Sequence, residues 1–125
     1  MTGLYNLLPK IKQRPGMYLG VASITSLRMF IVGYEFARKE MAFEATEAES
    51  DFYKNFQPWV QQRFQLKTVN SWDKIILLYS VDEKEAFQYF FELIDEFIAR
   101  NKHFDSEKID AAHQLLQEEN TAIKA

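Results

Sequence analysis

Carboxylates, histidines and serines are the side chains with which a chain that lacks cysteine could do chemistry. Glu92, Asp95 and Glu96 fall within one helical turn, an arrangement that could support general acid and base catalysis. The apolar residues of the same segment define its buried face, so we expect these carboxylates to face water. Neither His103 nor His113 has a second histidine four residues away, which a helical metal site requires. We therefore expect a protein that is not an enzyme and holds no metal or other cofactor.

The acidic side chains favour a protein-binding surface instead. The net charge is -3, but residues 1–43 carry +4 and residues 44–125 carry -7. A nucleic-acid-binding domain usually has a dense basic stripe, and only Lys10 to Arg14 approach one, so no nucleic-acid partner is expected. We predict that acidic residues attract a basic partner protein and that Trp72 anchors the contact. The carboxylates assigned to this surface are Asp82, Glu83, Glu85, Glu92, Asp95 and Glu96.

A second candidate site lies near the start of the chain. Residues 12–20 read Lys-Gln-Arg-Pro-Gly-Met-Tyr-Leu-Gly, and we expect Pro15 and Gly16 to end a first helix and a tight connection to follow. A phosphate could rest on Lys12, Arg14 and exposed amides near Gly16, with Tyr18 beside them. This alternative predicts a module that senses a small ligand or a nucleotide.

The same segment is similar to the Arg-Pro-Gly-Met-Tyr-Ile-Gly segment near the start of the ATPase domain of DNA gyrase B subunits and related type II topoisomerases. In that family the next helix carries a glutamate that activates water and an asparagine that holds magnesium. The corresponding residues 30–37 lack the Glu-x-x-x-Asn order, and no Asp-x-Gly-x-Gly adenine-binding motif follows. The resemblance therefore implies a shared local turn, in which Arg14 contacts carbonyl groups and Tyr18 packs inward, without ATP hydrolysis.

As a whole, the chain resembles a family of small bacterial proteins that combine this start with two further segments. The first is a Gly-Tyr-x-x-Ala helix, here within Ile31 to Arg38, and the second is Ser-Trp-x-x-Ile-x-x-x-Tyr, here Ser71 to Tyr79. In size, acidity and lack of catalytic residues, such proteins are similar to the immunity proteins encoded beside contact-delivered bacterial toxins. The resemblance implies that the partner is a basic toxin domain and that binding neutralises it.

Hydrophobic periodicity predicts an all-α fold, a single-domain orthogonal bundle of five to seven helices over residues 1–125. For residues 74–80 a buried strand fits almost as well as a helix, and helix is favoured. A more polar last helix over 106–125 is either loosely docked or engaged with a second subunit. The expected helices are one around residues 4–11, one over 24–42, one from a capping box at Thr46 that Pro58 kinks or divides near Gln57, one after Ser71, one over 83–101 and one from Ser106.

The helix expected over 24–42 has apolar residues on more than one side. Met29, Val32 and Phe36 widen the stripe that continues the core, so we expect this helix to pack on two sides. Gly33 and, four residues later, Ala37 together form a notch of small residues on this helix. We expect a neighbouring helix or an aromatic ring to enter this notch.

The remaining expectations concern location and alternatives. No stretch of the sequence has the features of a signal peptide or the roughly 20 apolar residues that span a bilayer, so neither a membrane nor export is expected. The absence of cysteine fits the reducing cytoplasm. Besides the immunity protein and the ligand sensor, a third hypothesis is an oligomeric structural or regulatory protein whose last helix completes a dimer.

Overall fold

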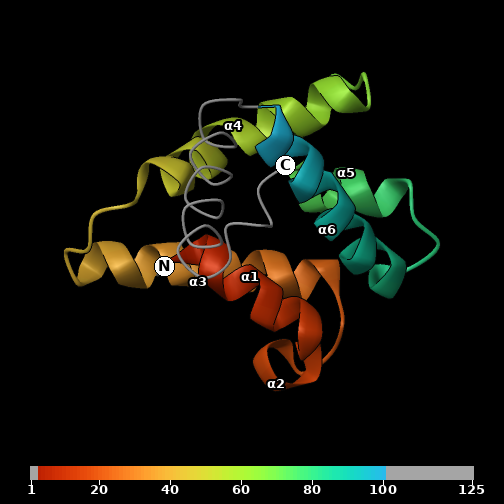
Figure 1. Ribbon diagram of the computed structural model, residues 1–125. Coiled ribbons are helices and arrows are strands. Elements are labelled where there is room, and N and C mark those ends of the chain that lie inside the picture. Colours follow the sequence, from red (N-terminus) through yellow and green to blue (C-terminus); the bar gives the residue numbers. More distant parts are fainter. Residues whose placement is uncertain (1–2, 101–125) are drawn as a thin grey trace, which may run out of the picture. The chain divides into compact units, whose positions relative to one another are not determined.

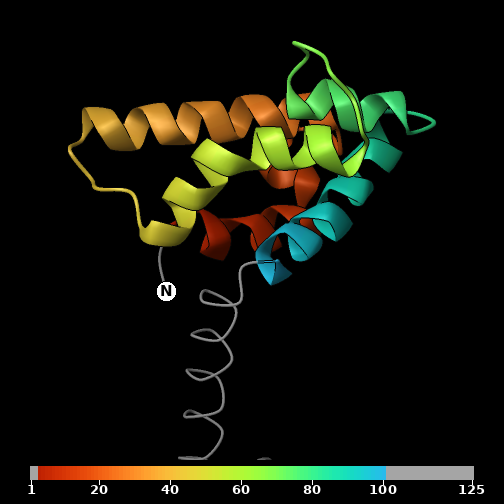
Figure 2. The ribbon, with the colours of Figure 1, turned by 90° about the horizontal axis from the view of Figure 1, so that it is seen from above.

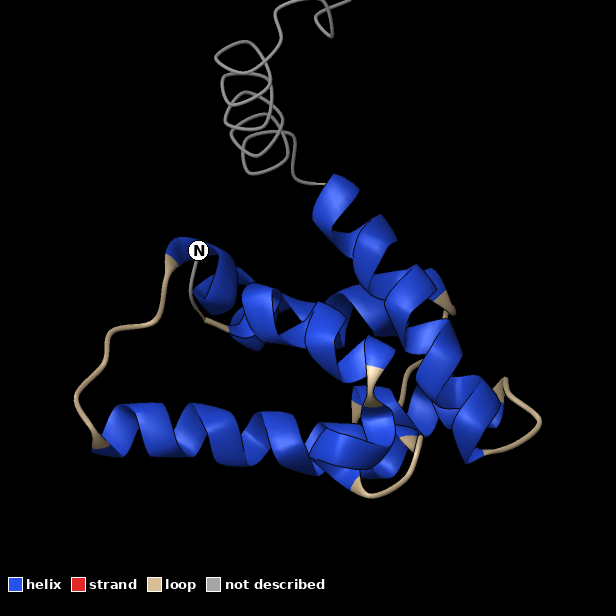
Figure 3. Cartoon of the chain, turned by 60° about the horizontal axis from the view of Figure 1, so that its bottom comes forward, coloured by secondary structure: helices blue, strands red, loops and turns tan. Residues whose placement is uncertain are grey.

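The computed structural model describes residues 3–100, and all of its regular structure in this range is helical (Figures 1 and 3). The all-α prediction is confirmed. The helix expected from Ser106, together with both histidines, lies outside the described residues. Contacts divide the chain into two compact units, Met1–Leu93 and Ile94–Ala125. The helices are α1 (Leu4–Gln13), α2 (Pro15–Leu19), α3 (Ile24–Glu40), α4 (Glu47–Arg63), α5 (Trp72–Leu78) and α6 (Glu83–Ala99).

Local capping explains where the longer helices begin. The Ser23 hydroxyl accepts a hydrogen bond from the Ser26 N–H at 3.1 Å, and α3 starts at Ile24, directly after Ser23. Thr46 and Glu49 form the predicted capping box at the start of α4. At the start of α6, an Asp82 carboxylate oxygen accepts from the Glu85 N–H at 2.8 Å. These caps satisfy N–H groups that have no partner within the helix.

Two proline-containing segments differ from expectation. Residues 15–19 form the one-turn helix α2 instead of an irregular connection, because proline is preorganised for the first helical position. Gly20 ends α2 with a φ of 81°, the left-handed conformation that glycine adopts at little cost. A kink or a division was predicted near Gln57, and the division is wrong, since α4 runs unbroken through the exposed Pro58. Phe56 and Val60 are buried on either side of Pro58, and their burial offsets the lost backbone hydrogen bond.

An aromatic cluster forms the centre of the first unit. Phe56 of α4 stacks on Phe52 at 4.9 Å between ring centroids and meets Trp72 of α5 edge-on at 5.3 Å. Phe90 of α6 lies 5.6 Å from Phe56 and 5.2 Å from Trp72. One cluster of four rings therefore joins α4, α5 and the first half of α6. Ile75 and Ile76 are buried in the same unit, and the segment that also fitted a strand is the helix α5.

A buried carboxylate links three helices of this unit. The Glu49 side chain, only 1% exposed, accepts a hydrogen bond from the Leu4 N–H at 2.7 Å and another from the Thr46 N–H at 2.9 Å. Its second role is an ion pair with Arg38 of α3 at 3.2 Å. One carboxylate thereby caps α1 and α4 and fixes the end of α3, where the chain turns back through residues 41–46 (Figure 2).

A second buried carboxylate ties α3 to α5. Asp73, in the first turn of α5, accepts a hydrogen bond from the Arg28 guanidinium at 3.1 Å and another from the Ser71 hydroxyl. The Arg28 guanidinium carbon also lies 5.9 Å from the centroid of the Trp72 ring. The ion pair covers one side of the aromatic cluster.

Candidate partner-binding surface

The residues of the predicted acidic surface lie on α6 and, in the case of Asp82, directly before it. Asp82, Glu85 and Glu92 are all exposed in the first unit. Glu85 accepts a hydrogen bond from the Val81 N–H at 2.7 Å through one carboxylate oxygen, and Asp82 uses one oxygen for the Glu85 N–H. The caps at the start of α6 therefore hold both carboxylates in fixed positions. Asp95 and Glu96 are exposed in the last turns of α6, which belong to the second unit.

Glu83 has a structural role that the sequence did not predict. Its carboxylate accepts hydrogen bonds from the Ser23 hydroxyl at 2.8 Å, the Thr25 N–H at 3.0 Å and the Thr25 hydroxyl at 2.8 Å. Burial by itself would raise the pKa of Glu83, but these hydrogen bonds outweigh it and hold the pKa below its ordinary value. Glu83 therefore joins the start of α6 to the start of α3, and its carboxylate is not free for a partner.

The prediction that Trp72 anchors a partner is wrong, because its side chain is in the core. Only 7% of Trp72 is exposed, and its neighbours are Phe52, Phe56 and Phe90. The apolar spacing of α5 is consistent with this position. Whether a tryptophan at such a position faces solvent depends on the helices packed against it, which the local pattern does not contain.

The exposed apolar residues are instead at the end of α5. Leu78, Tyr79 and Val81 are exposed, and Tyr79 is 47% exposed. The Tyr79 ring stacks on Phe64 at 4.6 Å with an interplanar angle of 15°, and Phe64 contacts Tyr89 edge-on at 6.0 Å. Asp82 and Glu85 follow directly in the sequence. We refer to Leu78, Tyr79, Val81, Asp82 and Glu85 as the corner surface.

The apolar part of this surface was not predicted, because the apolar run over residues 74–80 does not itself show where the helix ends. The α5 helix has only seven residues, and its buried apolar residues are Trp72, Ile75 and Ile76. Leu78 is the last helical residue and Tyr79 follows it as the C-cap. The signal that could have revealed the exposed end is the polar cluster Ser80 to Glu85, which requires a turn directly after Tyr79.

The candidate ligand site near the start of the chain is built differently from the expectation. Lys12 and Arg14 are exposed, and the Lys12 ammonium lies 5.6 Å from the centroid of the Phe91 ring. Tyr18 packs edge-on against Phe30 at 6.4 Å, as the inward packing predicted. The N–H groups of Met17 and Tyr18 both donate to the Arg14 carbonyl oxygen, at 3.1 and 3.4 Å. These two amides beside Gly16 are therefore occupied within α2 and do not form a phosphate cradle.

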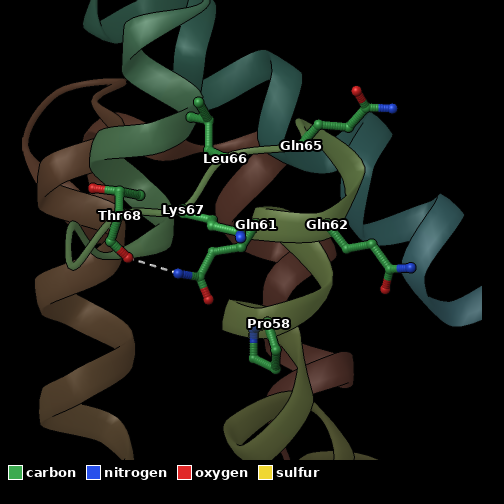
Figure 4. Close-up of a pocket in the computed structure, with 7 residues that line it drawn as sticks. All are labelled: Pro58, Gln61, Gln62, Gln65, Leu66, Lys67 and Thr68. Carbon is green, nitrogen blue, oxygen red and sulfur yellow. Dashed lines mark hydrogen bonds between the residues drawn. The ribbon is translucent and has the colours of Figure 1, made fainter.

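A shallow depression of about 660 Å³ lies at the end of α4 (Figure 4). Its lining includes three glutamines and one charged side chain, Lys67. Gln61 donates a hydrogen bond to the Thr68 carbonyl oxygen at 2.7 Å, and Gln57 donates to the Asn70 carbonyl oxygen at 2.9 Å. Gln57 and Gln61 therefore hold the connection between α4 and α5 in place. The lining supplies neither an acid–base pair nor a nucleophile with its base.

Two further classes of site are absent from residues 3–100. In this range no three histidine, aspartate or glutamate side chains are grouped so that they could hold a metal ion. None of the helices in the same range has the length and hydropathy needed to cross a bilayer.

Comparison of the chain with protein-family models, curated proteins and solved structures finds no match in any of the three.

Proposed function

We propose that the protein is a non-catalytic binding module that captures a basic partner protein through the corner surface. The observation that carries this proposal is Tyr79, an exposed aromatic ring held against Phe64 and followed by carboxylates that caps hold in place. Tyrosine is enriched among the residues that dominate binding energy at protein interfaces. The corner surface combines such an anchor with two fixed negative charges.

The geometry favours binding for an entropic reason. A flexible aromatic side chain loses rotamer freedom when a partner immobilises it, at a cost of about 0.5–1.5 kcal/mol. The stack on Phe64 already restricts the Tyr79 ring, so less freedom remains to be lost. Asp82 and Glu85 each use one carboxylate oxygen for a cap and leave the other for a partner lysine or arginine.

The specific role we propose is that of an immunity protein, which neutralises a basic toxin domain by covering its surface. Two features support this role: the net charge of -7 over residues 44–125, and the similarity to immunity proteins in size, acidity and lack of catalytic residues. Opposite charges accelerate the encounter, and an aromatic anchor slows dissociation. Inhibition of this kind needs no catalytic group in the inhibitor.

The first experiment is capture of partners by the tagged full-length chain from cells that express it, followed by mass spectrometry and measurement of the complex's mass. We expect one basic protein at a fixed stoichiometry. Binding of that protein is then measured for Tyr79→Ala and for the double variant Asp82→Lys/Glu85→Lys, which reverses both charges of the corner surface. Both should weaken binding at least tenfold, and the weakening caused by charge reversal should shrink as salt is raised.

A matched control separates the corner surface from net charge. Glu40→Lys/Glu44→Lys changes the net charge by the same amount at two exposed residues at the end of α3 and in the loop that follows. Its affinity should stay within about twofold of the parent at physiological salt. Equal weakening by both double variants, or an unchanged affinity of Tyr79→Ala, would contradict the assignment of binding to the corner surface.

A further inference from the structure

The outward face of α3 is apolar, and the described residues leave it uncovered. Met29 is 62% exposed and Phe36 is 64% exposed, and Val32 between them is also exposed. The expectation that α3 packs on two sides is therefore wrong for residues 3–100. Its buried residues Ile24, Leu27 and Ile31 lie on the opposite side of the helix. We refer to Met29, Val32, Gly33 and Phe36 as the α3 face.

We propose that the α3 face binds the α3 face of a second copy of this chain, with the two helices antiparallel. Large side chains stand at the two ends of the face, seven positions apart, and the smaller Val32 and Gly33 occupy its middle. A Cβ atom placed on Gly33 would meet no atom within 4 Å, so the middle of the face is open. The face is thus nearly the same read in either direction, which a twofold interface requires.

Antiparallel packing lets the two faces fill each other. When the twofold axis passes between positions 32 and 33, Phe36 of one copy lies beside Met29 of the other. Val32 of each copy then lies over Gly33 of the other, where no Cβ keeps the helices apart. The helix that was predicted to enter the notch of small residues at Gly33 is then α3 of the second copy.

The charges along one edge of the α3 face select the same orientation. Helical geometry places Arg28 and Glu35 on this edge, toward opposite ends of the face. Arg28 pairs with Asp73 through its Nη1 atom, and Glu35 pairs with Lys39 through Oε2 at 3.1 Å. An antiparallel pair brings Arg28 of one copy toward Glu35 of the other. In a parallel pair the two edges would lie on opposite sides of the interface, and these opposite charges would not face each other.

This inference is independent of the proposed function, because the α3 face shares no residue with the corner surface. Its first test is the mass of the full-length chain by sedimentation over a range of concentrations. We expect a concentration-dependent dimer whose dissociation constant rises at least tenfold in Phe36→Glu. Val69→Glu places the same charge on another exposed apolar residue and should leave the dimer unchanged. A chain that is monomeric at every concentration, or a dimer that Phe36→Glu leaves intact, would overturn the inference.

The orientation is tested by disulfide cross-linking, which the cysteine-free chain permits without background. Gly33→Cys places a thiol next to the twofold axis, and we expect it to cross-link two copies on mild oxidation. Glu40→Cys is the matched control, because in the antiparallel pair its two thiols would be about 22 Å apart along the helices. A disulfide spans at most about 7 Å between Cα atoms. Efficient cross-linking of Glu40→Cys without that of Gly33→Cys would refute the antiparallel arrangement.

Discussion

Replacing Glu49 by alanine should destabilise the first unit more than any other substitution of a charged residue. The change removes the acceptor of the Leu4 and Thr46 N–H groups and the partner of the Arg38 guanidinium. Leu4 is fully buried, so its N–H would lose its only side-chain acceptor without gaining water. Arg38 would keep the Tyr34 hydroxyl at 2.8 Å but lose its carboxylate.

The magnitude follows from these contacts. A buried N–H left without a partner costs about 1–3 kcal/mol, and breaking a buried ion pair by removing one member costs about 3–5 kcal/mol. Because Arg38 keeps some solvent exposure and one hydrogen bond, we expect a total loss of about 3–5 kcal/mol in the free energy of unfolding. Domains of this size have about 5–15 kcal/mol in all, so the variant should still fold.

The assay is urea unfolding followed by tryptophan fluorescence, since Trp72 lies in the core. A loss of this size moves the midpoint by more than about 1 M at the usual slope of about 1–3 kcal/mol per M. Glu47→Ala is the matched control: it removes an exposed glutamate from the same helical turn and should cost about 0.3–1 kcal/mol through the helix dipole. Equal midpoints for the two variants would refute the linking role of Glu49.

Three further substitutions have definite expected outcomes. Trp72→Ala should cost about 3–5 kcal/mol of unfolding free energy, whereas Trp72→Phe should keep the fold and leave the affinity for the partner unchanged. Weaker binding by a folded Trp72→Phe variant would show that Trp72 does anchor the partner. Glu83→Gln should lower stability at pH 7. The folded-state pKa of Glu83 lies below the unfolded value of about 4.3, so its contribution to the unfolding free energy is complete above that pH and is lost as pH falls through the folded-state pKa. The stability difference between the variant and the parent should therefore close in acid. A constant difference from pH 7 to pH 3 would contradict this expectation. Gly33→Ala should raise the unfolding free energy of the dilute chain by about 0.5–1 kcal/mol, since the added methyl group meets no neighbour and alanine favours helix; a loss of stability would mean that the site is not open.

The helices were predictable because their signals are local. The capping box at Thr46 and the 3.6-residue period around Phe90 lie within a few residues of the structure that they specify. The position of α5 followed from Ser71 and the apolar residues after it. Such signals located the starts of the helices. At residues 74–80 they favoured a helix only slightly over a strand, because so short an apolar run fits both periods, and the structure has the helix α5 there.

The surface was predictable only in part, because exposure depends on residues far away in the sequence. The carboxylates of α6 face solvent as the periodicity predicted, but Glu83 is taken by Ser23 and Thr25, some 60 positions earlier. Trp72 and Tyr79 are both aromatic residues of the kind that anchors protein interfaces. Packing of α4 and α6 against α5 buries the first and leaves the second exposed, and no local pattern specifies that packing.

The polar links between helices also bear on how fast the folded state is lost. Glu49, Asp73 and Glu83 reach partners 45, 45 and 58 positions away in the sequence, at Leu4, Arg28 and Thr25. Helices form locally in microseconds or less, whereas these contacts require distant segments to be in place already. Substitutions at the three carboxylates should therefore accelerate unfolding more than they slow folding. The three carboxylates would then set the lifetime of the folded chain against proteolysis and thermal inactivation.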